Sequence, residues 1–436
     1  MNKILLTLGL ATICTANLFA GETLHLKLIP DRDVVLRGRP QEVVIKIDLS
    51  AITGREKVRR TPLNLAVVLD KSGSMAGAKL EKTKQAAMQL VDRLAPNDIF
   101  SLIIFSDAAR VLVPAQKVED KEALKEKIES IESGGSTALY AGVKMGADQI
   151  KEYFSSKRIN RVILLSDGLA NVGPSTPRDL RRLGGDLAER GISVTTIGVG
   201  DDYNEDLMAG LAEASDANYY YVKDTEKLPE IFAKELGGML AVAARDVRIE
   251  IICPDGVKPL GFIGRAEKFE SQKAAVNLSQ FTTGQNRYLF LRCLVNGNKS
   301  EVARVNVNYK DELADGSEQS ASGVVRIDFT DSQSAADKSV NGEVVAQKEL
   351  ILTAVAKDTA MAQADAGNYK QAAETLAAQN ASLSRAYAAA PAGVQIQIRA
   401  ETNNLSDFSG QLGGGSYNGA SRKALSAQSY NTRNSK

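Results

Sequence analysis

Oxygen-bearing side chains occur at close spacing directly after a predicted buried strand. The strand is the apolar run Leu65–Leu69, and a segment with helical periodicity follows the loop. Asp70, Ser72 and Ser74 lie on that loop. Open α/β sheets place their ligand sites at the carboxyl ends of their strands. One carboxylate and two hydroxyls there are hard oxygen donors of the kind that Mg²⁺ takes in octahedral geometry. The spacing therefore predicts part of a magnesium site, which needs further oxygens from elsewhere in the chain.

Two later segments supply further oxygens. Thr137 follows the glycine pair Gly134–Gly135, which allows a tight turn and so brings Thr137 close to another loop. Asp167 follows another predicted buried strand and projects from the same sheet edge as Asp70. Capping of the next helix is the alternative reading of the first loop, since Ser and Asp favour such positions. Capping would not require Thr137 and Asp167 as well, so we expect three loops to meet at one metal site.

The elements that must position these loops alternate between strands and amphipathic helices. The predicted strands are Leu65–Asp70, Ile99–Phe105, Arg110–Val113, Arg161–Ser166, Ile192–Val199 and Asn218–Val222. The predicted helices are Gly77–Leu94, Lys121–Ile131, Leu139–Phe154, Arg178–Arg190 and Glu205–Ala214. Such alternation implies right-handed crossovers, a mainly parallel sheet and helices on both faces. The predicted fold class is therefore α/β and doubly wound.

Asp70, Ser72, Ser74, Thr137 and Asp167, in this order and on these elements, resemble the metal-ion-dependent adhesion site of von Willebrand factor type A domains. The resemblance implies a Rossmann-like domain over residues 62–240. It also implies that the two serines and the threonine ligate the metal through their hydroxyls. The two aspartates then bind the metal directly or hold its coordinated waters. Mg²⁺ is the expected ion, with Mn²⁺ or Ca²⁺ as alternatives.

The resemblance further implies a function. A site dominated by neutral hydroxyls leaves much of the Mg²⁺ charge uncompensated, so an Asp or Glu of a partner protein can fill the open position. We therefore expect a protein-binding module for adhesion or scaffolding. The alternative is a structural subunit of an envelope assembly, or one associated with a channel, whose metal mainly stabilises the fold. Other acids near the same sheet edge, Asp107, Asp201 and Asp202, are predicted to form turns rather than to ligate.

Composition narrows the function classes. The 54 basic residues nearly balance the 53 acidic ones, and tryptophan is absent, so nothing indicates a nucleic-acid partner. His25 is the single histidine, which removes histidine-rich zinc sites and makes Ser-His-Asp or Cys-His hydrolysis implausible. We expect no enzyme.

The first residues have the pattern of a secretory signal peptide over residues 1–20, with a short basic start, an apolar stretch and small residues. Cleavage is predicted after Ala20, with Ala16 as the alternative. Lipidation at Cys14 is rejected because Ile13 is bulky where a lipobox needs a small residue. No other window is apolar for long enough to cross a membrane, so export to the periplasm or the exterior is predicted.

Strand-like segments flank the α/β region on both sides. Residues 21–61 hold two predicted strands and residues 241–331 hold four more, and we expect all of them to form one β-sandwich with the α/β domain inserted. This layout resembles bacterial secreted proteins with such a domain set into a β-sandwich. Residues 340–409 read as a helical segment that packs on the sandwich. Residues 410–436, rich in Gly, Ser and Asn, are predicted to be disordered.

Cys253 and Cys293 are the cysteines outside the predicted signal peptide. Both are predicted to face the core of the β-rich region. An even number of cysteines in an exported protein permits one disulfide, which we expect here. Two buried reduced thiols are the alternative.

Overall fold

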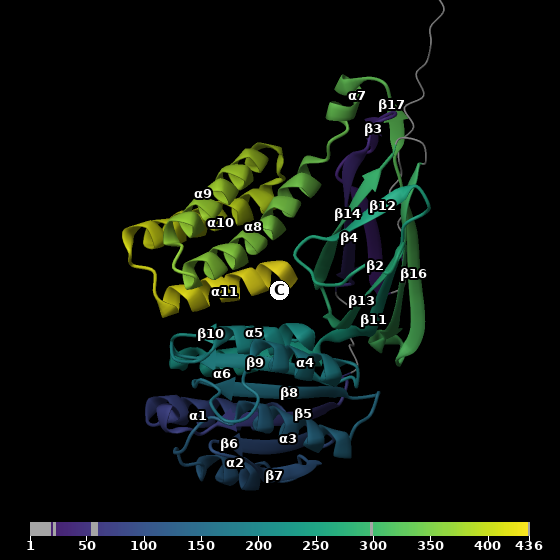
Figure 1. Cartoon of the computed structure of the whole chain (residues 1–436). Coiled ribbons are helices and arrows are strands. Elements are labelled where there is room, and N and C mark those ends of the chain that lie inside the picture. Colours follow the sequence, from purple (N-terminus) through teal and green to yellow (C-terminus); the bar gives the residue numbers. More distant parts are fainter. Residues whose placement is uncertain (1–18, 21–22, 54–59, 297–299, 435–436) are drawn as a thin grey trace, which may run out of the picture.

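The computed structural model describes residues 19–20, 23–53, 60–296 and 300–434. Three bodies make up the chain: an α/β domain, a pair of antiparallel sheets, and a set of long helices (Figure 1). The predicted signal peptide lies outside the described residues except for Phe19–Ala20. These two residues form the short strand β1, antiparallel to β2 (Leu24–Pro30). Cleavage after Ala20 stays a prediction.

A single sheet forms the centre of the α/β domain, with the strand order β10-β9-β8-β5-β6-β7. All neighbours pair in parallel except β6 and β7, which are antiparallel. Every residue of the four central strands is buried, which explains why they read as continuous apolar runs. The strands are β5 (Leu63–Asp70), β6 (Ile99–Phe105), β7 (Ala109–Lys117), β8 (Ile159–Ser166), β9 (Ser193–Val199) and β10 (Tyr219–Val222).

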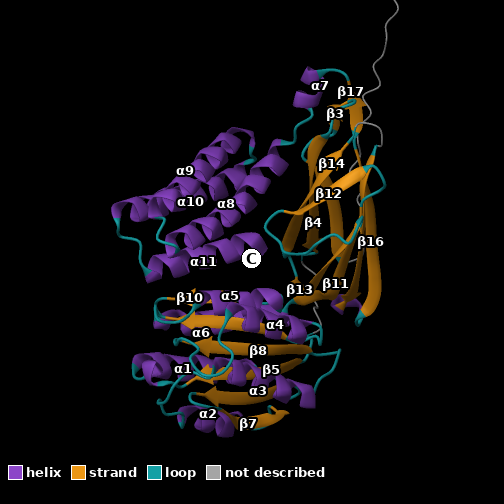
Figure 2. Cartoon of the chain, in the orientation of Figure 1, coloured by secondary structure: helices purple, strands orange, loops and turns teal. Residues whose placement is uncertain are grey.

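Helices cover both faces of this sheet, as the predicted doubly wound fold requires (Figure 2). One face packs against α1 (Ala78–Arg93), α2 (Lys121–Glu129) and α6 (Leu228–Leu240). The other face packs against α3 (Leu139–Glu152), α4 (Pro177–Ala188) and α5 (Glu205–Ala214). The sequence located every one of these helices except α6. The predicted fold class is confirmed.

Strands from both sides of the α/β domain combine in two antiparallel sheets. One has the order β1-β2-β4-β14-β12, so that β4, which precedes the domain, pairs with β14, which follows it. The other has the order β13-β11-β15-β16. Buried side chains of both sheets form one core, and the α/β domain is an insertion between their strands. The strands are β4 (Gln41–Ala51), β11 (Val242–Ile252), β12 (Val257–Phe262), β13 (Lys273–Thr282), β14 (Asn286–Val295), β15 (Glu301–Asp311) and β16 (Ser317–Arg326).

Two small elements connect the sheets to the helices. Strand β17 (Asp328–Thr330) pairs in parallel with β3 (Val34–Leu36), and α7 (Gln333–Lys338) follows it. The prediction placed one strand over Gly323–Phe329, where the structure has the end of β16 and the start of β17. Strands β12 and β13 had no predicted counterpart.

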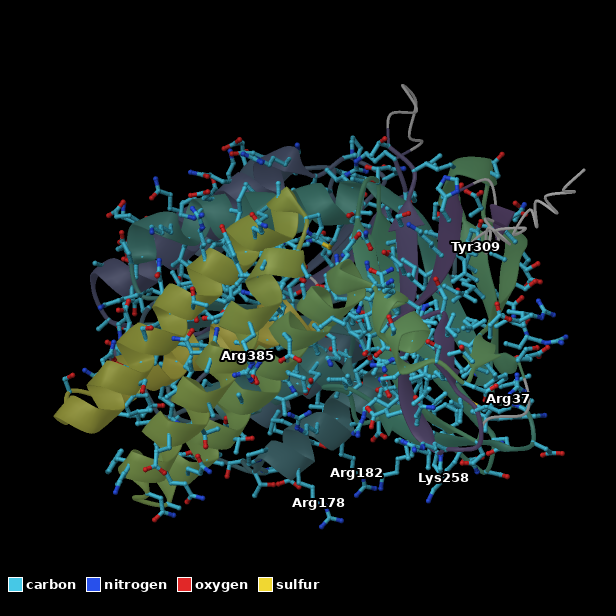
Figure 3. All side chains as sticks on the ribbon, turned by 90° about the horizontal axis from the view of Figure 1, so that it is seen from above. Arg37, Arg178, Arg182, Lys258, Tyr309 and Arg385 are labelled. Atoms are coloured by element: carbon cyan, nitrogen blue, oxygen red, sulfur yellow. The ribbon has the colours of Figure 1, made fainter. Side chains whose placement is uncertain are left out.

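Four helices form the third body: α8 (Gly342–Asp365), α9 (Tyr369–Ala386), α10 (Ala392–Gly414) and α11 (Gly419–Asn434). Helix α8 packs on the sandwich through Val344 and Ile351, as expected. From above, these helices and the sandwich lie beside each other over the α/β domain, with Arg178 and Arg182 of α4 projecting from its rim (Figure 3). In the part of the chain that the structure describes, no helix is long and apolar enough to span a membrane.

The predicted disorder of residues 410–436 is wrong for its described part. Helix α10 extends to Gly414, and α11 lies between α8 and the α/β domain (Figure 1). The prediction failed because α11 has few apolar residues and makes ion pairs with the α/β domain, so its sequence shows no apolar stripe. Arg422 reaches Glu205 at 2.6 Å, and Lys423 reaches the same carboxylate at 3.1 Å. Tyr430 packs on the α/β domain, with its ring 5.6 Å from that of Tyr219, and Leu425 is buried in the core of the four helices.

The predicted disulfide is not formed in this structure. Cys253 and Cys293 are both buried and free, and their sulfur atoms lie 3.8 Å apart. This separation exceeds the ~2.05 Å of an S–S bond. The prediction that both thiols face the sandwich core is confirmed, since both belong to its buried cluster.

Candidate metal centre

The candidate site begins at the end of β5, where Asp70 is fully buried. One carboxylate oxygen accepts a hydrogen bond from the Ser72 amide at 2.8 Å, and the other accepts one from the Ser166 hydroxyl at 2.5 Å. Burial raises the pKa of Asp70, while the hydrogen bonds from Ser166 and Ser72 oppose that rise. The pairing of β5 with β8 explains the contact, since Ser166 ends β8 beside the end of β5. Two adjacent strands therefore fix this carboxylate.

A chain of hydroxyls joins the first loop to Asp167. The Ser72 and Ser74 hydroxyl oxygens are 3.1 Å apart. The Ser74 hydroxyl donates to Oδ1 of Asp167 at 2.7 Å. Asp167 is fully buried, whereas Ser74 lies at the exposed mouth of the cluster. On its other side, Oδ2 of Asp167 accepts from the ammonium of Lys79 at 2.5 Å.

Thr137 reaches the same place through the glycine turn that precedes it. The backbone joins the two loops, because Gly73 donates to the Gly135 carbonyl at 3.0 Å and Gly134 donates to the Lys71 carbonyl at 2.6 Å. Gly135 has φ +87°, which favours glycine. The glycine pair therefore acts as predicted.

The backbone at Gly168 shows how closely the groups converge. A Cβ atom placed on Gly168 would lie 2.8 Å from Oγ1 of Thr137 and 3.6 Å from Oδ2 of Asp70. A side chain there would crowd these oxygens, so the glycine keeps the space beside them open. The structure therefore brings all five predicted residues together, from the loops after β5 and β8 and the loop before α3.

Asp107 positions the threonine loop without facing the cluster. Its Oδ1 accepts from the Ser136 amide at 2.8 Å, and the hydrogen bonds from Ser136 lower the pKa of Asp107. A Cβ atom on Gly135 would approach Oδ2 of Asp107 to 2.6 Å, so this contact also requires glycine. The interpretation of Asp107 as a turn residue agrees with this geometry. Asp201 accepts a hydrogen bond from the Tyr221 hydroxyl at 2.6 Å.

Three contributors were missed from the sequence. Ser166 and Lys79 bond the two aspartates, and Asn171 fixes the threonine loop, accepting from the Thr137 amide at 2.9 Å. Ser166 had a usable signal, since it precedes Asp167 at the end of a strand. Lys79 and Asn171 had none, because a lysine in a first helical turn and an asparagine in a loop are ordinary at such positions.

The donor set fits a hard divalent cation. It offers two carboxylates and three hydroxyls, and the Lys79 ammonium already lies against one carboxylate as a positive charge. Within the described ranges, no group of three or more His, Cys, Asp and Glu side chains could hold a metal. Any metal at this site must therefore take part of its coordination from hydroxyls, which suits Mg²⁺ better than a soft ion.

Apolar side chains project from the loop that carries Asp167. Leu169 is 57% exposed and Val172 is 36% exposed. Lys71 lies on the facing loop, with its ammonium 3.3 Å from the Gly134 carbonyl. The cluster therefore opens onto a surface that combines apolar and basic groups.

The α/β domain is doubly wound and carries an oxygen-lined cluster at the carboxyl ends of its strands. Residues 64–234 match the family model of the von Willebrand factor type A domain. The α/β domain therefore is a von Willebrand factor type A domain, a family of protein-interaction and adhesion modules. The match covers this domain and not the sandwich or the helices.

Similar proteins extend the comparison beyond the domain. The chain is 30% identical over 268 residues to uncharacterized protein sll0103 of Synechocystis, which covers 58% of this chain and 63% of that protein. It is 26% identical over 283 residues to uncharacterized protein YfbK of Escherichia coli, covering 63% of this chain and 49% of that protein. The matches thus span about half to two thirds of these relatives.

A solved structure resembles nearly the whole chain. The von Willebrand factor type A protein from Catenulispora acidiphila superimposes with a TM-score of 0.71 at 18% identity. The superposition covers 90% of this chain and 91% of that one. The arrangement of domain, sheets and helices therefore recurs as a fold.

Proposed function

We propose that this protein is an extracytoplasmic, Mg²⁺-dependent protein-binding module in which the metal captures an acidic residue of a partner protein. The main support is the convergence of Asp70, Ser72, Ser74, Thr137 and Asp167 from three loops. The membership of the domain in a family of interaction modules agrees with this role. The predicted signal peptide supports the location outside the cytoplasm.

The roles of the five residues follow from their chemistry. Ser72, Ser74 and Thr137 would hold the metal through neutral hydroxyl oxygens, and Asp70 and Asp167 would bind it directly or through water. Mg²⁺ there supplies a coordination position that attracts a carboxylate, and Mn²⁺ or Ca²⁺ are alternative ions. Three neutral donors leave more positive charge for a partner than an all-carboxylate site would. Binding rather than catalysis is therefore the proposed activity.

The surrounding surface suggests what lies next to the captured acid in a partner. Leu169 and Val172 expose apolar area beside the cluster, and burial of such area favours association. The basic Lys71 on the facing loop repels basic partners and attracts acidic ones. A partner segment with an Asp or Glu next to an aliphatic side chain matches both features.

A selection experiment tests the proposal. Random peptides displayed on phage are selected on the full chain in Mg²⁺ and eluted with chelator. We expect enrichment of Asp- or Glu-containing peptides, their loss in Asp70→Ala, and their retention in the control Asp201→Ala at the same sheet edge. Binding that is unchanged by chelator and by Asp70→Ala would overturn metal-mediated capture.

The same protein samples address the structural alternative. If the metal mainly stabilises the fold, chelator lowers the midpoint of thermal unfolding while no acidic peptide is selected. This outcome would favour a scaffold or channel-associated subunit. If the metal serves capture, the peptides are selected and the change in midpoint is secondary.

A further inference from the structure

Lys79 lies directly against the candidate metal centre, although it is not one of the five residues. It is the second residue of α1, and its ammonium is 2.5 Å from Oδ2 of Asp167. The Lys79 side chain is 28% exposed, whereas that of Asp167 is fully buried. The ion pair therefore places a positive charge at the inner wall of the site.

The surroundings of Lys79 hold it in this position. A Cβ atom on Gly200, at the end of β9, would lie 3.5 Å from both Cε and Nζ of Lys79. The carboxylate of Asp202 lies 3.9 Å from the ammonium on the solvent side and is 78% exposed. The side chain thus extends from α1 past the end of β9 to reach Asp167.

Both oxygens of Asp167 already have partners. Oδ1 accepts from the Ser74 hydroxyl at 2.7 Å, and Oδ2 accepts from Lys79. A buried carboxylate without a positive partner would carry a large desolvation cost. Lys79 therefore compensates the negative charge of the buried Asp167.

We propose that Lys79 is an internal counter-cation of the metal centre, which competes with the metal for Asp167 and so sets a weaker, tunable metal affinity. This inference rests on the proposed metal-binding function. With a metal bound, the lysine would add one further positive charge to the site that attracts a partner's carboxylate. Lys79 would thereby favour capture of an acid at the expense of metal affinity.

Removal of the Lys79 charge changes the metal affinity through two effects, and both act in the same direction. In the metal-free protein, Lys79→Met leaves the buried Asp167 without a counter-charge, which raises the free energy of that state. In the metal-loaded protein, the substitution removes repulsion between ammonium and metal. Both effects strengthen metal binding, and we expect an increase in affinity of about tenfold. If Lys79 instead only positions Asp167 for the metal, its removal must weaken binding.

The experiment uses the full chain and Mn²⁺, whose free concentration is followed by electron paramagnetic resonance. Lys79→Met is expected to bind Mn²⁺ about tenfold more tightly, with a larger rise in unfolding midpoint on metal addition. Lys79→Arg keeps the charge and is expected to bind as the wild type does. Lys82→Met is the matched control, because Lys82 lies on the same helix, is also 28% exposed, and pairs with Glu226 at 2.8 Å.

The outcomes separate this inference from the function on which it rests. Loss of Mn²⁺ binding in Asp70→Ala supports the metal site whatever Lys79 does. Equal or weaker binding in Lys79→Met, with that site present, overturns the counter-cation role. Lys79→Gln gives a second variant, since its amide can still donate to Asp167 without the charge, and it is also expected to bind more tightly. Absence of Mn²⁺ binding in the wild type would overturn the proposed function itself.

Discussion

The ion pair between Asp216 and Arg287 joins the α/β domain to the sandwich and gives the sharpest stability prediction. Asp216 lies in the turn between α5 and β10, and Arg287 lies on β14. The guanidinium donates to the two carboxylate oxygens at 2.7 and 3.2 Å, and the Ser279 amide of β13 adds a bond at 2.5 Å. The side chains are 17% and 5% exposed, so solvent screens the pair only weakly.

The substitution Asp216→Asn removes the negative charge with little other change. Asp216 has φ +47°, a left-handed conformation that Asn tolerates and Ala does not. Breaking a buried ion pair by removing one partner costs ~3–5 kcal/mol. Because Asn keeps one oxygen acceptor, we expect the lower end of ~3 kcal/mol. For a domain of this size, that loss lowers the unfolding midpoint by roughly 6–12 °C.

Calorimetry of the full chain measures this change, and a double-mutant cycle with Arg287→Met isolates the pair. We expect a coupling energy of ~2–3 kcal/mol. The control cycle uses Glu42→Gln and Arg292→Met, a bidentate pair at 2.8 and 2.9 Å on the same sheet whose side chains are 39% and 43% exposed. Exposed pairs contribute ~1 kcal/mol or less. A coupling energy no larger than that of the control would refute the reasoning.

Three further predictions concern other parts of the molecule. Under oxidising conditions Cys253 and Cys293, 40 positions apart, are expected to form a disulfide that stabilises the sandwich by about 4 kcal/mol, measured by thiol labelling and by unfolding with and without reductant. A rise in stability on reduction would contradict this. The pKa of Glu213 lies below its ordinary value of 4.5, because burial raises it but the charge of Arg433 lowers it further. This carboxylate therefore stabilises the protein above pH 4.5. Its contribution is lost as the pH falls through the lowered pKa, and the difference in midpoint between wild type and Glu213→Gln is therefore expected to shrink below pH 4.5; a constant difference would refute the assignment. Asp107→Ala is expected to weaken Mn²⁺ binding about tenfold, because the loop that it orients carries Thr137, a proposed metal ligand. Unchanged affinity would show that the loop holds its position without this carboxylate.

The sequence predicted the fold of the α/β domain closely because burial on both faces leaves a strong signal. Helix α5 and strand β6 begin and end at the predicted residues. Strand β7 was predicted too short, over Arg110–Val113, because it is an edge strand with alternating exposure and a proline at position 114. Edge strands of this kind contain few buried apolar residues, so the sequence pattern indicates their length poorly.

The site was predictable because its chemistry restricts residue type and because chain direction places strand ends together. Asp70 is the last residue of β5 and Asp167 directly follows the parallel neighbour β8, so their proximity follows from the topology. Lys79 could not be found in this way, since its contact depends on how far a flexible side chain reaches from α1. A contact between a long side chain of one helix and a residue of another element depends on how the elements pack, and the hydrophobic periodicity of the sequence does not predict that packing.

Several attachments of the α/β domain lie at one margin of its sheet, away from the candidate metal centre. Helix α5 is joined at its start to α11 through Glu205, which pairs with Arg422 and Lys423. Just after its end, Asp216 joins the sandwich, and the Ala217 carbonyl accepts from the hydroxyl of Tyr430.

These contacts all belong to α5 and the turn before β10, the outermost strand of the sheet (Figure 1). The candidate metal centre instead lies on the loops of β5 and β8, which are central strands. Because β9 lies between β8 and the outer strand β10, the bundle and the sandwich can hold the domain without covering its oxygen cluster, where Ser74 stays exposed. A partner can therefore approach that edge while the rest of the chain stays docked, which is the arrangement that a binding module needs.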